Sequence, residues 1–291
     1  MPIASELTID NTATATTLAQ TIFGSGLTVT GASLTGAAVQ SGTFTGGDAT
    51  LGDISVADTG IILSTGDVAD VTNSSGTLDT NVAAGTSTNH SGAGDSDLDT
   101  VSGQTTFDAV TLNVNFDATS AGFLTMQFTF SSEEYLEYVN SGVNDAFGVW
   151  VNGTYAPFTP AASDLVSIDT INDASSSNLY LDNPDTADTY NTEMDGTTIV
   201  LSIKAPIIAG ANTMKIALGD GGDGALDSNV LIAADSVQTF ALAFDDTVTL
   251  EQNTSITVDV LANDSDETGG GLSVIEINGN TVTVGTPLTL P

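Results

Sequence analysis

The chain has 291 residues with two Lys or Arg against 37 Asp or Glu, so its formal net charge at pH 7 is −35. A charge of this sign excludes nucleic acids and anionic membranes as partners, and a hydrophobic content of 40% indicates a folded protein. Cysteine is absent, which excludes disulfides, thiol chemistry and Cys-based zinc sites. The expected counter-ions are hard cations such as Ca²⁺, which bind carboxylate and carbonyl oxygens. The alternative is that the acidity serves solubility alone.

The sequence contains no obvious export or membrane signal. Its first ten residues lack the basic and apolar regions of an amino-terminal secretion signal. No apolar run reaches the length of a membrane span. We therefore expect either a cytosolic protein or one whose export signal lies beyond Pro291 or is missing from this sequence.

The amino-terminal part predicts mainly strands and turns. Residues 8–60 are rich in Thr, Gly and Ala, and residues 60–64 form an apolar run typical of a buried strand. One short helix is expected over residues 16–23, because Leu18 and Ile22 fall at helical spacing. Three further short runs have the composition of strands: 26–30, 33–36 and 41–45.

The same amino-terminal segment is a candidate for self-association. Residues 8–60 carry few of the charges that protect a sheet edge. Such a segment can add as a strand to the sheet of a second copy of the chain. The alternative is that it pairs within its own domain, since consecutive strands usually lie next to each other.

A long polar stretch follows over residues 68–106. A loop of this length inside a compact domain is more often functional than idle. It contains Asp95, Asp97 and Asp99 at alternating positions, a spacing seen in calcium loops. It lacks the Gly and the bidentate Glu of an EF-hand at the defining offsets, so these three acids are weaker candidates for calcium ligands.

Three strands are predicted in the middle of the chain. Residues 107–116 and 123–130 alternate between apolar and polar side chains, and residues 146–151 read in the same way. The first two are expected to form an antiparallel pair joined at residues 117–122.

Six oxygen-bearing side chains lie between the second and third of these strands, without a Lys, Arg or His. Acids crowded at short range repel one another, and Ca²⁺ takes roughly six to eight oxygen ligands. We therefore expect a calcium ion here; the alternative is that the neighbouring aromatic residues form a core and the acids its solvated rim. The six residues are Glu133, Glu134, Glu137, Asn140, Asn144 and Asp145, and the expected side-chain ligands are Glu133, Glu134, Asn144 and Asp145.

A second candidate calcium loop lies near residue 220. Strands are predicted over residues 197–203, 213–218 and 230–233, and a glycine-rich loop containing Asp220, Asp223 and Asp227 precedes the last of them. Glycine lets such a loop fold closely while its carboxylates converge. We expect a second ion here, apart from the first; the alternative is a solvated hairpin loop.

Catalysis finds little support in the sequence. His90 is the only histidine and lies in the polar stretch, without an evident nucleophile or base beside it. Glu133 and Glu134 are adjacent, so on a strand they point to opposite faces and do not form a facing pair for glycoside hydrolysis. We expect no enzyme.

The composition changes after residue 243. Residues 244–291 contain short alternating runs separated by Gly269, Gly270 and Gly271, which indicates the start of a small β-sandwich. About fifty residues are fewer than such a module usually needs. We therefore divide the chain into one domain over residues 1–243 and an incomplete module over residues 244–291.

Two families are similar to these two parts. Residues 12–240 resemble the choice-of-anchor L domain of bacterial surface and secreted proteins. The resemblance rests on residues 60–67, 94–99, 132–141, 144–148, 195–196, 218–220 and 227–228. Residues 244–291 resemble the opening of the cadherin-like repeats of secreted bacterial adhesins, through Asp245, Asp246 and residues 260–266. Proteins of this kind often leave the cell by a route that uses a carboxy-terminal signal, which would explain the missing amino-terminal signal peptide.

These observations together predict an all-β protein, a jelly-roll-like β-sandwich with long calcium-binding loops followed by a partial cadherin-like sandwich. The expected function is that of an extracellular calcium-binding structural or adhesive module of a secreted bacterial surface or biofilm-matrix protein. The expected partners are calcium and either a second copy of the chain or surface glycans. Two alternatives remain: a lectin-like domain in which calcium and the exposed aromatics Tyr155 and Tyr180 hold a sugar, and a glycan hydrolase.

Overall fold

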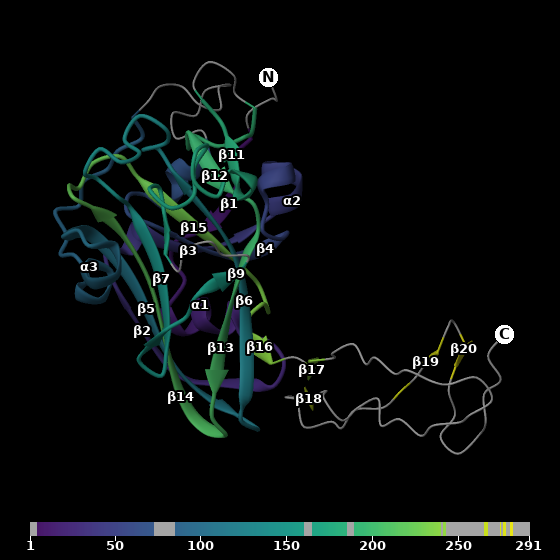
Figure 1. The fold of residues 1–291 in the computed structure, drawn as a ribbon. Helices are drawn as coiled ribbons and strands as arrows, with labels where there is room; N and C mark the ends of the chain where they lie inside the picture. Colours follow the sequence, from purple (N-terminus) through teal and green to yellow (C-terminus); the bar gives the residue numbers. More distant parts are fainter. Residues whose placement is uncertain are drawn as a thin grey trace, which may run out of the picture.

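The protein is a sandwich of two antiparallel β-sheets, as the computed structural model shows (Figure 1). The structure describes residues 5–72, 85–159, 165–184 and 189–239, together with 241–242, 265–266, 274, 276–277 and 280–281. The all-β sandwich predicted from the alternating runs is therefore confirmed.

The larger sheet contains ten strands. Their central member is β6 (Gly122–Ser132), which pairs with β15 and β16 on one side and with β12 and β13 on the other. The main order is β1 (Thr8–Asp10), β3 (Ser41–Thr45), β4 (Thr59–Ser64), β15 (Ser228–Ala233), β6, β12 (Gly196–Thr198) and β11 (Tyr180–Asp182), and the side members are β13 (Leu201–Ile207), β9 (Phe158–Thr159) and β16 (Gln238–Thr239).

The smaller sheet contains six strands around the long antiparallel pair β14 and β5. Its order is β10 (Val166–Ser167), β7 (Ala146–Val151), β14 (Gly210–Gly221), β5 (Thr106–Ala118) and β2 (Leu27–Thr35), with β8 (Thr154–Tyr155) paired to β7.

The expected pairing of residues 107–116 with 123–130 is wrong. The two runs are β5 and β6, and they belong to different sheets. Each has an apolar face of the right period, but these faces meet across the sandwich: Phe116 of β5 and Phe128 of β6 are buried in the same cluster. Alternation shows which face of a strand is buried, and it does not tell a hairpin from a crossing between sheets.

The amino-terminal strands pair inside their own domain. β1 pairs with β3, β3 with β4, and β2 with β5. The alternative to strand addition, pairing within the domain, is therefore the arrangement in the structure. Self-association of the chain stays a prediction.

Short helices cover the sandwich at three places. The predicted helix is confirmed as α1 (Ala15–Ile22), whose Leu18 and Ile22 enter the core between the sheets. Two helices were not expected, α2 (Gly47–Leu51) and α3 (Ser96–Ser102), and the polar stretch is thus less loop-like than its composition suggests. Short 3₁₀ segments lie at η1 (Ala38–Gln40), η2 (Gly52–Ile54), η3 (Val68–Val71) and η4 (Ser177–Leu179).

Three apolar clusters stabilise these layers. The main one lies between the sheets, a second packs α2 on the outer face of the larger sheet, and a third packs Leu98 of α3 on the outer face of the smaller sheet. The outer layers explain why both faces of β7 and β15 are buried. Successive side chains of a strand point to opposite faces. Val230 therefore packs in the cluster between the sheets, and Leu231 packs in the cluster on the outer face.

The segment after residue 240 is described only in short pieces. β17 (Ala241–Leu242) pairs with β18 (Ser265–Asp266), and β19 (Glu276–Ile277) pairs with β20 (Asn280–Thr281). Most of the runs that resemble a cadherin-like repeat lie outside the described residues, so that module and the boundary at residue 243 stay predictions. Among the helices that the structure describes, none is long and apolar enough to cross a membrane.

Candidate cation centre at the end of the sandwich

The candidate site begins where β6 ends. Phe128 and Phe130 of this strand face the core, and Ser132 continues their row at full burial. Glu133 and Glu134 follow directly and are both 1% exposed. Their side chains meet different neighbours, as the alternation of a strand predicts.

Glu134 reaches two acids of the opposite sheet. It shares a hydrogen bond with Asp145, which directly precedes β7, and both interact with Asp220 of β14. We call Glu134, Asp145 and Asp220 the inner acidic centre. It joins the larger sheet to the smaller one at the end of the main core.

Hydrogen bonds hold the inner acidic centre in place but leave two of its carboxylate oxygens without a partner. Asp145 Oδ1 accepts from Gly221 N at 2.9 Å and Oδ2 from Ser228 Oγ at 2.7 Å. Asp220 has a hydrogen bond with Thr65. Glu134 Oε2 and Asp220 Oδ1 are buried and have no hydrogen-bond partner. Two buried carboxylate oxygens without a donor are costly, so each needs a proton or a cation.

The electrostatics of this centre are entirely acidic. Burial, followed by the charge of Asp145, raises the pKa of Glu134 to about 10. Burial likewise raises the pKa of Asp145 to about 7 and that of Asp220 well above the ordinary range. The two basic side chains of the chain lie elsewhere, with Lys215 paired to two aspartates and Lys204 over the Phe123 ring.

Asn144 and Asp223 border this centre. Asp223 is exposed and its charge acts on Glu134 and Asp145. Asn144 Oδ1 accepts from Asp169 N at 3.1 Å, and its own backbone N donates to Gly221 O at 2.7 Å. The expected separation into two groups is therefore wrong, because Asp220 and Asp223 lie with Glu134 and Asp145. β14 runs past the predicted strand to Gly221, and Asp220 lies two residues after the inward-facing Leu218, so it faces the same side of the strand.

Asp227 borders the inner acidic centre through its charge, which acts on Asp220, but its own hydrogen bond goes to a different segment. Its Oδ1 accepts from Thr88 N at 2.8 Å, and Oδ2 is buried without a hydrogen-bond partner. Its carboxylate lies against Gly66, where an added Cβ would stand 1.9 Å from Oδ2. Burial raises the pKa of Asp227 to about 7, and Asp70 raises it further.

Glu133 also points away from the inner acidic centre. Its Oε1 accepts from Thr86 N at 3.0 Å, and its Oε2 is buried without a partner. Burial raises the pKa of Glu133 to about 8, and the charges of Asp195 and Glu193 add to this rise. Asp195 and Glu193 were not among the predicted ligands. The only sequence signal near them is segment 195–196, one of the segments that carry the family resemblance, whose Gly196 begins β12 beside β6.

The sequence matches the family described as "Choice-of-anchor L domain" over residues 7–238. The chain belongs to the choice-of-anchor L family. No curated protein matches it significantly. Among solved structures, a family 35 carbohydrate-binding module from Clostridium thermocellum is similar at 16% identity and a TM-score of 0.20, over 42% of this chain and 69% of that one.

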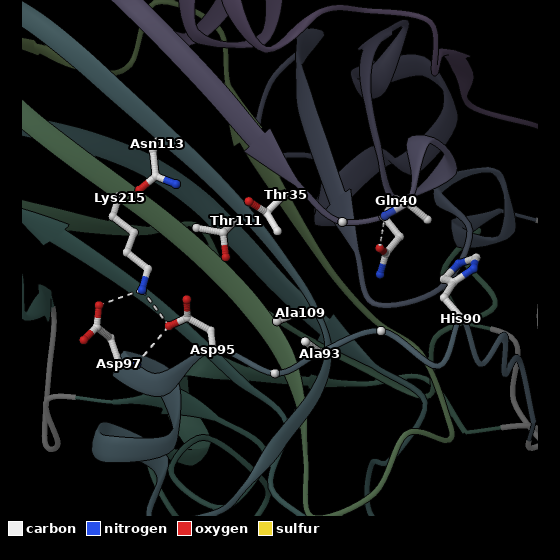
Figure 2. A pocket seen from close by; sticks show the side chains of 14 residues that line it. Thr35, Gln40, His90, Ala93, Asp95, Asp97, Ala109, Thr111, Asn113 and Lys215 are labelled. Carbon is white, nitrogen blue, oxygen red and sulfur yellow. Dashed lines mark hydrogen bonds and ion pairs between the residues drawn. The ribbon is translucent and has the colours of Figure 1, made fainter.

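The remaining three candidates of this choice-of-anchor L domain lie around α3, away from the buried acids. Asp95 and Asp97 each hold Lys215 Nζ at 2.6 Å (Figure 2). Asp95 Oδ1 also caps α3 by accepting from Leu98 N at 3.1 Å. Asp99 Oδ1 accepts from both Thr106 N and Thr106 Oγ1 at 2.7 Å. The alternating spacing thus marks a helix N-terminus docked on the sheet.

A polar groove lies beside this helix. It has a volume of about 600 Å³ and is bordered by residues of β2, β5 and β14 as well as the segment before α3 (Figure 2). Lys215 with its two aspartates lies at one end and His90 at the other. The aromatic residues expected to hold a sugar are not both available, because Tyr180 is buried and donates to Asp182 Oδ1 at 2.9 Å. Tyr155 is half-buried against Trp150.

The buried acids do not form a finished metal shell. Within the described residues, no three His, Cys, Asp or Glu side chains already converge in a geometry that would hold an ion. A cation at the inner acidic centre would therefore need hydroxyl or carbonyl oxygens as well, together with small side-chain rotations. Its orphaned oxygens and the lack of a basic neighbour nevertheless fit a hard cation.

Proposed function

We propose that this choice-of-anchor L domain is an extracellular, calcium-stabilised structural or adhesive module of a secreted bacterial surface or biofilm-matrix protein. A Ca²⁺ ion at the inner acidic centre would fasten the two sheets together. The observation that carries the proposal is that Glu134, Asp145 and Asp220 are buried together from both sheets, with orphaned oxygens and without a basic partner.

The energetics favour a cation over the bare acids. Two like charges about 4 Å apart repel by about 4 kcal/mol at an effective dielectric constant of 20, and each buried charge adds a desolvation penalty of several kcal/mol. Protons relieve both costs but remove the charges. A divalent ion relieves the repulsion and uses the oxygens as ligands, with exposed Asp223 as a further carboxylate at the edge.

Location and architecture support the same role. Membership of the choice-of-anchor L family supports a surface or secreted protein. Without cysteine, an extracellular domain of this chain has bound metal as its available cross-link. The proposed cadherin-like module after residue 243 would continue the chain as a further bead. The role is one of binding or assembly, without catalysis.

The test is calcium binding by the full chain. Isothermal titration after removal of metal should show saturable Ca²⁺ binding that Asp220→Asn weakens by at least about tenfold, since a lost charged ligand costs about 1.4 kcal/mol or more. Asp117→Asn is the matched control, because Asp117 is exposed and lies at the opposite end of the β5–β14 pair from Asp220. Equal binding by all three proteins would contradict the proposal.

A second candidate function is glycan binding in the groove beside α3. The groove is favoured by its size and its polar side chains, among them Thr111 and Asn113 of β5. A glycan array probed with and without chelator separates the two roles. Binding that Asn113→Ala abolishes, with calcium affinity unchanged, would support a lectin-like domain.

A further inference from the structure

We propose a second cation site on the outer face of the larger sheet, built from Glu133, Asp195 and Asn229, with Ca²⁺ as the ion. We call these three residues the outer acidic centre. The proposal extends the proposed function but rests on different residues, so either can fail alone.

Strand register brings these residues together. Ser131 of β6 pairs with Asn229 of β15 on one side and with Thr197 of β12 on the other. Residues in register share a face, and residues two positions further along share it too. Two residues beyond Ser131 and Thr197 in this antiparallel ladder come Glu133 and Asp195.

The shared face is the outer one. Leu231, two residues from Asn229, packs in the cluster under α2, whereas Val230 packs between the sheets. Glu134 and Glu133 therefore serve opposite sides of the same sheet. An ion at the outer acidic centre would therefore use ligands that the inner acidic centre does not share.

Two buried oxygens here lack a partner. Glu133 Oε2 and Asn229 Oδ1 have no hydrogen bond, and each residue is 1% exposed. The other atom of each group is already held: Glu133 Oε1 by Thr86 N at 3.0 Å, and Asn229 Nδ2 by Met194 Sδ at 2.9 Å. The amide is thus fixed with its oxygen left over, which is the atom that a hard cation selects.

The surrounding charge is negative. Asp195 and Glu193 both act on the Glu133 carboxylate, and both are buried. Lys215 lies on the smaller sheet, where it is paired with Asp95 and Asp97. A carboxylate, a second carboxylate and an amide oxygen in one buried place match the ligand types of calcium rather than those of a transition metal.

The site would fasten a loop to the sheet. Residues 189–195 run across the outer face, where Glu193 N donates to Val71 O at 3.1 Å and Thr192 Oγ1 to Val71 O at 2.7 Å. Asn183 Nδ2 donates to Met194 O at 3.0 Å from the other side. An ion between Asp195 and Glu133 would add a direct link from this loop to the central strand.

The first experiment measures stoichiometry with the full chain. Calcium titration of the wild type should give one ion more per chain than that of Asp195→Asn, while Asp220→Asn loses a different class of site and the double variant loses both. Asp117→Asn is again the control. If Asp195→Asn binds as many ions as the wild type with unchanged affinity, the outer acids are held by protons and the proposal is wrong. If only Asp220→Asn loses a calcium ion, the proposed function holds and the outer acidic centre is not a calcium site.

A second measurement needs no variant. Hydrogen exchange of the wild-type amides in residues 189–195 should slow by about tenfold or more between chelator and saturating calcium. Asp220→Asn should retain this protection, because Asp220 is not a ligand of the outer acidic centre. Exchange in this loop that calcium leaves unchanged would overturn the proposal, even if Asp195→Asn does not fold.

Discussion

Glu133 and Glu134 are neighbours in the chain, yet they belong to different acidic groups on opposite faces of the larger sheet. Glu134 shares a hydrogen bond with Asp145 of the other sheet, whereas Glu133 accepts from Thr86 N and faces Asp195. One strand end thus supplies a carboxylate to the interior of the sandwich and another to its outer layer. Both are buried, so any ion they bind is tied to folding.

The first prediction is that calcium raises the melting temperature. A ligand that binds only the folded state stabilises it by about 2.7 kcal/mol at a hundredfold excess over Kd. For a domain of this size, 1 kcal/mol corresponds to about 2–4 °C. Melts by circular dichroism in calcium and in chelator should therefore differ by several degrees. Magnesium at equal concentration is the control for ionic strength, and superimposable melts in calcium and chelator would refute the prediction.

The second prediction is a change of sign for Asp220→Asn. In chelator this variant should be at least as stable as the wild type, because the amide removes a buried acid with an orphaned oxygen and keeps its shape. In saturating calcium it should be less stable, because a ligand is lost. Urea unfolding in both conditions measures the two differences. A variant destabilised equally in both would show that Asp220 is needed only for packing.

Much of this fold could be predicted from the sequence, since alternation locates strands whatever sheet they join. β4, β6, β7 and α1 were all predicted close to their observed bounds. The sheet to which each strand belongs could not be predicted, because β5 and β6 use the same apolar pattern to face each other that a hairpin would use to face a common core.

The acidic centres were predicted in composition but not in grouping. Glu134 and Asp145 are near in sequence, and their crowding was evident. Asp220 joins them only through the register of β14 against β7, and Asp195 meets Glu133 only through that of β12 against β6. Long-range register has no signature in a single sequence, so nothing in it placed Asp195 or Asn229 beside Glu133.

The third prediction concerns pH in the absence of metal. Burial raises the pKa of Glu133 to about 8 and that of Asp227 to about 7, whereas unfolded carboxyls titrate near 4. The folded state therefore holds more protons between these values, so stability falls as pH rises from about 4 and levels off above about 7 to 8. The slope is about 1.4 kcal/mol per pH unit for each extra proton held.

Urea midpoints in chelator from pH 5 to pH 9 measure this slope, and the same series in calcium is the comparison. Calcium should flatten the curve, because an ion replaces protons as the neutralising charge. Stability that stays flat or rises from pH 5 to pH 9 in chelator would contradict the raised pKa values of the buried acids.

The last prediction separates the acids around α3 from the calcium centres. Asp95 caps the helix and holds Lys215, so Asp95→Ala should cost about 1–2 kcal/mol in the free energy of unfolding. The loss should be the same in calcium and in chelator, because a cap does not depend on an ion. Asp97→Ala is the matched control: its side chain is 53% exposed and its ion pair with Lys215 should contribute less than about 1 kcal/mol. A loss for Asp95→Ala that appears only in calcium would instead make this helix end a metal site, as the alternating aspartates first suggested.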